Sequence, residues 1–94
     1  MIELEYDQGF IVGVCEWWTV DRWGTWDIKD NHIWIEKAHI IPDYRNNGIL
    51  KKWIKIIAEK APQADKAYFK RGERNEHPRT FSVKRWLKQI NREV

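Results

Sequence analysis

Hydrophobic and polar residues follow a period of two in the first half of the chain, which is typical of β-strands. Residues 10–20, FIVGVCEWWTV, are β-branched and aromatic and predict a long strand. One face of this strand, with Glu16 as an exception, collects Phe10, Val12, Val14, Trp18 and Val20. Residues 32–41, HIWIEKAHII, predict a second long strand.

The segment between these two strands predicts a short strand over residues 25–29, bounded by turns at 21–24 and 30–31. Short connections between three consecutive strands predict an antiparallel meander. The first nine residues, MIELEYDQG, provide at most a short additional strand.

The spacing of apolar residues changes at Pro42. Residues 42–48 predict a loop, and residues 49–60 predict a helix with apolar residues on one side and lysines mostly on the other. Residues 66–70 predict a fourth strand. Because it follows a strand-loop-helix unit, we expect it to pair in parallel with the strand at 32–41.

The last segment allows two interpretations. Apolar residues from Phe81 to Val94 fit a helical stripe, with Ser82 as a candidate N-cap. Residues 80–86 also alternate in the way that a strand would. The helix is the favoured interpretation.

Size and composition restrict the class of protein. The 94 residues, 43% hydrophobic and 33% charged, predict a single small α/β domain over 1–94 with a mostly antiparallel sheet. The single cysteine, Cys15, excludes an internal disulfide and predicts a small buried side chain. His32, His39 and His77 lack the spacing of metal ligands, so we expect no metal site. With no signal-peptide pattern and no apolar run long enough to cross a membrane, we expect a cytoplasmic protein without membrane contact.

Charge is distributed unevenly along the chain. Residues 1–47 carry four basic and nine acidic side chains, whereas residues 48–94 carry thirteen basic and five acidic ones. The net charges of the halves are therefore −5 and +8. A basic second half favours an anionic ligand, although a solvated basic face would have the same composition.

A candidate anion site lies where the predicted helix begins. The first amides of a helix have no intrahelical partner and carry partial positive charge, so they attract phosphate. Gly48 would let the backbone approach an anion closely, and Arg45 would add a charge-assisted hydrogen bond. Lys51 and Lys52 follow within one turn. An ordinary strand-to-helix turn would have the same composition.

This segment, IEKAHIIPDYRNNGILKKWIKIIAEKAP, resembles the acetyl-CoA-binding motif of the GNAT N-acyltransferases. In that family an Arg/Gln-x-x-Gly-x-Gly/Ala loop opens a helix, and its amides bind the cofactor pyrophosphate. Arg45 and Gly48 match this pattern, whereas Leu50 stands where a small residue is usual. The resemblance implies an acetyl-CoA site made of Arg45, Asn46, Asn47, Gly48, Ile49, Leu50 and Lys51, with backbone groups of His39, Ile40 and Ile41 on the pantetheine and the thioester carbonyl.

The chain is shorter than a full domain of this family. It has no room for the two helices that help to form the acceptor pocket, and the last two strands are lost or replaced. The chain therefore resembles a reduced GNAT core of the kind found in small phage and mobile-element proteins.

The resemblance also proposes a catalytic residue. Many GNAT enzymes carry a general base on the strand before the loop, where this chain has Glu36. Period two places His39 on the opposite face, so the two residues are not expected to act as a pair. The tyrosine that often serves as general acid has no counterpart in residues 80–90, TFSVKRWLKQI.

Two functions follow from these observations. The first is transfer of an acetyl group from acetyl-CoA to an amine. The second is a non-catalytic GNAT-derived module that binds nucleic acid or a host protein through its basic half. We also expect a sheet face containing Trp18, Val20, Trp26 and Trp34 to be covered, either in a homodimer or by the C-terminal helix.

Overall fold

The strands of the chain join into one sheet, and the computed structural model describes residues 1–21, 25, 32–70 and 79–92. The strands lie in the order β1-β2-β3-β4-β5. They are β1 (Ile2–Asp7), β2 (Phe10–Val20), β3 (His32–Ile40), β4 (Lys66–Phe69) and β5 (Arg79–Ser82). Neighbours are antiparallel except β3 and β4, which are parallel and flank the helix α1 (Ile49–Lys60). The α+β architecture with one parallel strand-helix-strand unit is confirmed.

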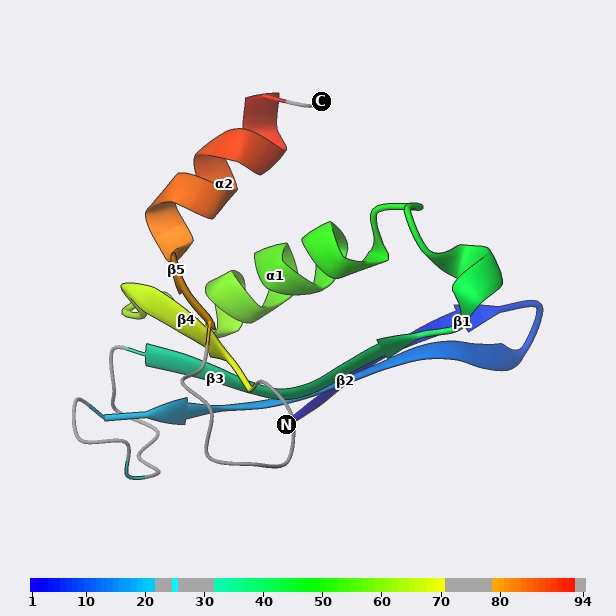
Figure 1. The fold of residues 1–94 in the computed structure, drawn as a ribbon, viewed down its shortest axis with the longest axis horizontal. Helices are drawn as coiled ribbons and strands as arrows, with labels where there is room; N and C mark the ends of the chain where they lie inside the picture. The colour runs from blue at the N-terminus through cyan, green and yellow to red at the C-terminus, as the bar shows by residue number, and fades with distance from the viewer. Residues whose placement is uncertain (22–24, 26–31, 71–78, 93–94) are drawn as a thin grey trace.

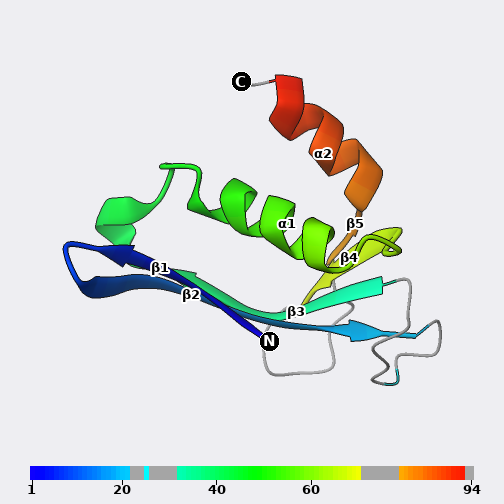
Figure 2. The same ribbon diagram turned by 180° about the vertical axis from the view of Figure 1, so that it is seen from behind.

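Both helices lie on the same face of the sheet (Figure 1). The reverse view in Figure 2 shows α1 and the C-terminal helix α2 (Val83–Arg92) again on one side of the strands. We call this side the helix face and the other side the open face. Within the described residues, no helix covers the open face.

The core forms between the helix face and α1. Alternate residues of β2 point to this face, so Cys15 and Trp17 are fully buried there with Ile33 and Ile35 of β3. The other set of β2, including Trp18, therefore lies on the open face. Burial raises the pKa of the Cys15 thiol to about 12, so this cysteine is a small core side chain, as predicted, and not a nucleophile.

A buried carboxylate ties β1 to this core. Glu3 is 8% exposed, and its Oε2 accepts a hydrogen bond from Trp17 Nε1 at 3.0 Å. Lys60 Nζ, at the end of α1, approaches the same oxygen to 2.8 Å. Burial alone would raise the pKa of Glu3, but the hydrogen bonds from Lys60 and Trp17 outweigh it and lower that pKa.

The N-terminal segment forms a short strand, as the sequence allows. Gln8 and Gly9 both have positive φ, at 51° and 83°, which makes a tight hairpin between β1 and β2. β1 thus becomes a six-residue edge strand. β2 pairs directly with β3, and the strand expected over 25–29 lies, apart from Thr25, outside the described residues.

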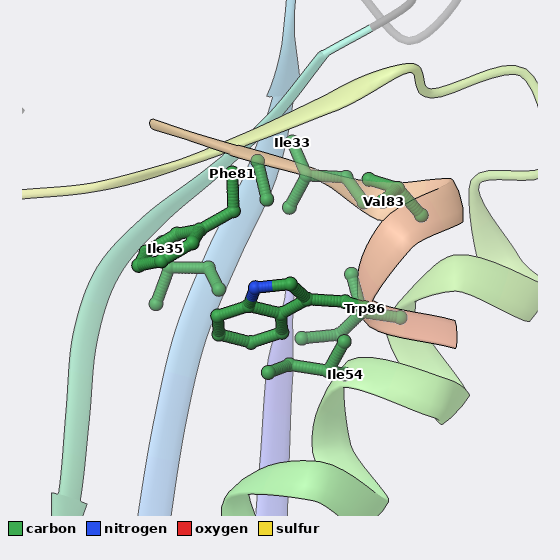
Figure 3. A pocket seen from close by; sticks show the side chains of 8 residues that line it. Ile33, Ile35, Ile54, Phe81, Val83 and Trp86 are labelled. Atoms are coloured by element: carbon green, nitrogen blue, oxygen red, sulfur yellow. The ribbon is translucent and has the colours of Figure 1, made fainter. Parts of the chain in front are cut away.

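The C-terminal segment combines both sequence interpretations. Residues 79–82 form β5, and the helix starts directly after it. Ser82 is the N-cap, because its Oγ accepts a hydrogen bond from the Arg85 amide at 3.4 Å. The expected alternative that this helix would cover the Trp-rich face is wrong, because α2 lies on the helix face, where its Val83 and Trp86 line a pocket with Ile54 of α1 (Figure 3).

The approach of α1 to the sheet depends on Gly13. A Cβ atom at this position would lie 2.8 Å from Cη2 and 2.9 Å from Cζ2 of Trp53. Trp53 is 1% exposed, and its Nε1 is buried without a hydrogen-bond partner among the described residues. The missing side chain at Gly13 therefore lets the indole pack closely against β2.

We expect Gly13→Ala to destabilise the protein by about 1–3 kcal/mol, because the added methyl group overpacks the Trp53 contact. In a Trp53→Phe background the penalty should be smaller, since a phenyl ring ends before the two clashing indole atoms. Urea unfolding of the four variants measures this coupling. An equal penalty in both backgrounds would contradict the contact.

Candidate functional site

One edge of β3 loses its neighbour halfway along the strand. The parallel ladder with β4 ends at the pair Ile35 and Phe69, followed by a hydrogen bond from the Lys70 amide to the Ile35 oxygen at 3.0 Å. β3 continues to Ile40, paired only with β2 on its other side. We call the edge of Glu36–Ile40 that points away from β2 the free edge, which holds for the described part of the chain.

Strand geometry decides which amides point to the free edge. The Ile41 amide donates to the Val12 oxygen at 2.9 Å, so it points to β2 and is not available to a ligand. Because amide directions alternate along a strand, the His39 amide also points to β2, whereas those of Ala38 and Ile40 point to the free edge. Of the three residues expected to contact pantetheine, only Ile40 therefore offers its amide.

The loop after β3 is anchored to the β1–β2 hairpin. It begins with the 3₁₀-helix η1 (Pro42–Tyr44), and the Tyr44 hydroxyl donates to the Asp7 carboxylate. This hydrogen bond raises the pKa of Tyr44. Arg45 donates through Nε to the Ile40 oxygen at 3.0 Å, which holds its guanidinium beside the free edge.

The start of α1 is open to a ligand. Asn46 and Gly48 have positive φ, at 67° and 78°, and Gly48 is the N-cap residue. Both are exposed, and a Cβ atom built on Gly48 would meet nothing within 4 Å. The exposed Asn47 lies between them. The loop therefore leaves space around the first amides of the helix.

The two apolar residues of the motif do not obstruct this space. Ile49 is buried in the core, so only its backbone remains for a ligand. Leu50 is half-buried and packs against the same core cluster. The departure at Leu50 from the small residue of the motif is thus accommodated by a side chain turned toward the core.

Lys52, in the first turn of α1, is bound to β1. Lys52 Nζ bonds both carboxylate oxygens of Glu5, at 3.1 and 2.9 Å, so its charge is largely matched by β1. Lys51 is exposed. The assignment of Lys51 to the anion site stays a prediction, and Lys52 is held by the acidic first strand.

A β-bulge lies at Glu36. The β2–β3 register shifts at this point, since Trp17 pairs with Ile35 while Glu16 pairs with Lys37. Glu36 is the extra residue, and it lies on the open face, where it accepts a hydrogen bond from Trp34 Nε1 at 2.8 Å. His39 pairs with Val14 and lies on the same face. The expectation that Glu36 and His39 lie on opposite faces is wrong, because the bulge adds one residue to the alternation.

The Glu36 carboxylate has two partners. Lys70 Nζ lies 2.6 Å from Oε1, at the point where β4 leaves β3. The hydrogen bond from Lys70, together with that from Trp34, lowers the pKa of Glu36. The carboxylate is therefore anionic at neutral pH and a weaker base than an ordinary glutamate.

Other candidate chemistry is limited. The described residues contain no group of three His, Cys, Asp or Glu side chains that could hold a metal ion. His77 lies outside them, as does Trp26. The helices that the structure describes are too short or too polar to cross a membrane.

An apolar pocket that sequence reasoning missed lies next to the end of the β3–β4 ladder (Figure 3). It is bounded by Ile33 and Ile35 of β3, Ile54 of α1, and Phe81 and Trp86 from the C-terminal segment. No pattern in the sequence predicts it, because it forms where β3, α1, β4, β5 and α2 meet. Apolar stripes at these positions predict only burial.

Comparison with known proteins identifies the architecture. No protein-family profile and no curated protein matches the chain. Among solved structures, it is similar to the GphF GNAT-like decarboxylase in complex with isobutyryl-CoA, with a TM-score of 0.58 and 13% sequence identity over 77% of this chain. The chain has a GNAT-like fold. It spans 46% of the length of that protein, and at this identity the likeness shows the fold alone.

We expect the carboxyl group of Glu36 to titrate below the ordinary pKa of a glutamate, and Lys70→Met to raise that pKa. The pKa of Glu36 rises in this variant because the positive charge of Lys70 stabilises only the anionic form of the Glu36 carboxyl group. Carboxyl-detected NMR titration measures both values. Lys66→Met, at the first residue of β4, is the matched control and should leave the pKa of Glu36 unchanged. A wild-type titration at the ordinary value would contradict the pairing.

Proposed function

We propose that this protein binds acetyl-CoA or a related acyl-CoA and transfers the acyl group to an amine. The observation that carries the proposal is the junction of the free edge of β3 with the open N-terminus of α1. At this junction, backbone amides on the free edge of β3 lie next to the unpaired first amides of α1. A strand edge of this kind can bind the peptide-like pantetheine, and a helix N-terminus can bind pyrophosphate. The likeness to a GNAT-like decarboxylase in complex with isobutyryl-CoA supports the same ligand class.

Each part of the junction has a role in this proposal. The amides from Gly48 to Lys51 hold the pyrophosphate, helped by the positive end of α1 and by the Arg45 guanidinium. Asn46 and Asn47 line the loop around it. The amides of Ala38 and Ile40 donate to the pantetheine arm and, near the bulge, to the thioester carbonyl, where negative charge develops during acyl transfer.

The acceptor would approach from the open face. Glu36 lies on that face, beside the end of the β3–β4 ladder, so its anionic carboxylate attracts an ammonium group. Loss of one ammonium proton to bulk water gives the neutral amine, whose nitrogen attacks the thioester carbonyl carbon. The carbon–sulfur bond breaks and the thiolate leaves. Glu36 accepts the amine proton directly or through a water molecule. Its lowered pKa predicts an acid limb of the activity profile well below neutral pH.

Charge pairing weakens the alternative of a nucleic-acid-binding module. Lys52, Lys60 and Lys70 of the basic half are paired with Glu5, Glu3 and Glu36 of the acidic half. The charge asymmetry along the sequence is therefore partly cancelled in the folded protein. Steep salt-dependent binding of a mixed-sequence oligonucleotide, together with no response to acyl-CoA, would favour the alternative.

We expect Gly48→Glu to weaken acetyl-CoA binding by at least about tenfold, because a carboxylate would occupy the space next to the pyrophosphate and repel it. Titration calorimetry gives the affinity, and amide NMR shifts of residues 45–52 give the location. Gly48→Ala is the control: it carries the same backbone strain without the charge. If acetyl-CoA at millimolar concentration moves none of these amides in the wild type, the proposed function fails.

We also propose that two copies of the chain pair through β1. This strand is an edge strand, and its open-face residues Ile2, Leu4 and Tyr6 are 61%, 40% and 56% exposed. Glu3 and Glu5 are already matched by α1 lysines, and Asp7, at the end of the strand, accepts a hydrogen bond from Tyr44, so the middle of the β1 edge carries no unmatched carboxylate. A two-fold contact would bury the exposed residues Ile2, Leu4 and Tyr6 and would form one side of a cleft for the acceptor amine between the subunits.

We expect sedimentation equilibrium at micromolar concentration to give twice the 11.5 kDa chain mass. Leu4→Lys, which places a charge in the middle of the exposed row, should return the protein to the monomer mass. Lys55→Ala, on the exposed side of α1, should have no effect. A wild-type mass of 11.5 kDa without concentration dependence would reject the dimer.

A further inference from the structure

A groove lies along the outer side of β5, where the described sheet ends. Its cavity volume is about 370 Å³, whereas the apolar pocket of Figure 3 holds only about 10 Å³, room for about one water molecule. The larger volume lies within the range of about 300–1,000 Å³ that is typical of ligand sites. The residues that line this β5 groove come from β5 and from one side of α2: Thr80, Phe81, Ser82, Arg85, Trp86 and Gln89. None of them belongs to the free edge of β3 or to the loop before α1.

Backbone groups of β5 face the groove. β5 is the last strand of the described sheet, and only β4 pairs with it. The Val83 amide donates to the Asp65 oxygen at 3.0 Å, so it points to the β4 side. Because amide directions alternate along a strand, the Phe81 amide also points to β4, whereas those of Thr80 and Ser82 point away from it. Together with the Thr80 oxygen, these two amides form a short strand edge that no described strand covers.

The side chains around the groove are cationic. Arg79, Lys84, Arg85 and Lys88 are exposed, and none of them forms an ion pair with another described residue. Residues 79–92 contain no acidic side chain. This segment therefore differs from the three lysines of the basic half that pair with glutamates of β1 and β3. Unmatched positive charge at the groove favours an anionic partner.

The aromatic residues of the groove favour a peptide over a nucleic acid. Phe81 and Trp86 are half-buried, and their ring centroids lie 4.4 Å apart. Phe69 packs against both rings, at 5.3 and 5.6 Å. Stacking of nucleobases needs exposed ring faces, and these rings cover one another. An uncovered strand edge beside a groove suits an extended peptide, since backbone hydrogen bonds hold the peptide and the groove selects its alternate side chains.

We propose that the β5 groove binds an extended acidic segment of a partner protein, which adds to the sheet as a further strand beside β5. Its backbone accepts hydrogen bonds from the amides of Thr80 and Ser82 and donates to the Thr80 oxygen. A carboxylate on the side that faces α2 pairs with Arg85 and accepts a hydrogen bond from the Gln89 side chain. Because β5 has four residues, the contact spans about 13 Å of the segment. This binding is independent of the proposed acyl transfer, since it uses other residues.

The test compares two labelled peptides of eight residues that alternate Glu and Val. In the second peptide every backbone nitrogen carries a methyl group, which removes all backbone donors and keeps the charge. Fluorescence anisotropy, at protein concentrations up to about 1 mM, gives both affinities. The first peptide should bind at least about tenfold more tightly, because only it can pair as a strand. Hydrogen exchange measured by NMR should slow at the amides of Thr80 and Ser82 and stay unchanged at Phe81, which already faces β4.

A charge-reversal variant locates the carboxylate contact. Arg85→Glu should weaken binding of the first peptide by at least about tenfold, because it replaces an attraction in the groove by a repulsion. Lys55→Glu makes the same change of net charge at an exposed position of α1 and is the matched control, with an expected effect below about twofold. The hydrogen-exchange result for the wild type decides the question even if Arg85→Glu does not fold.

Four results would overturn the proposal. Absence of binding at about 1 mM, or binding that leaves exchange at Thr80 and Ser82 unchanged, would reject strand addition. Equal affinity for the two peptides, or equal effects of the two variants, would reduce the interaction to general charge attraction. Tighter, steeply salt-dependent binding of a twelve-nucleotide single-stranded DNA at the same amides would make a nucleic acid the occupant. A protein that binds the peptide but no acyl-CoA would retain this inference and lose the proposed function.

Discussion

The contact between Trp53 and Gly13 controls where α1 lies on the sheet. No side chain at Gly13 separates β2 from the helix, so the indole packs directly on the strand. Gly13 pairs with Ile40, the last residue of β3. The same contact therefore fixes the N-terminal half of α1 near the end of β3, from which the loop to Gly48 departs. The relative position of the free edge and the helix N-terminus, on which the proposed ligand site depends, follows from this one close approach.

A second constraint arises from charge. β1 carries Glu3 and Glu5 on the helix face, where a carboxylate without partners would be costly to bury. Lys60 and Lys52, two turns apart on α1, neutralise them and align the helix along the strand. Trp17 supplies a further donor to Glu3 from inside the core. The lysines that make the helix basic in sequence are thus, in part, structural partners of the acidic first strand, which leaves less charge for a polyanionic partner.

At the Glu36 bulge, β3 changes from a packed core strand to a strand that forms part of the candidate site. Before it, Ile33 and Ile35 are core residues with strands on both sides. After it, Lys37, Ala38 and His39 are exposed, and no described strand pairs with one edge. The extra residue reverses the alternation, so Glu36 and His39 share the open face with Trp34. The bulge also separates two environments. One contains the amides of the free edge and an apolar pocket toward the helix face, and the other contains the Glu36 carboxylate, paired with Lys70 on the open face.

The sequence by itself determined the local structure. The period of apolar residues located β2, β3, α1 and β4, and the proline, asparagine and glycine residues of 42–48 located the loop, because strands, helices and turns depend mainly on neighbouring residues. The GNAT-like fold also followed from the motif at Arg45 and Gly48. Features that depend on pairing could not be predicted: the bulge that moved His39 to the face of Glu36, the partners of Lys52 and Glu3, the use of the Ile41 amide by Val12, and the pocket under Trp86. Each joins residues far apart in the chain, and only tertiary packing decides which of them meet.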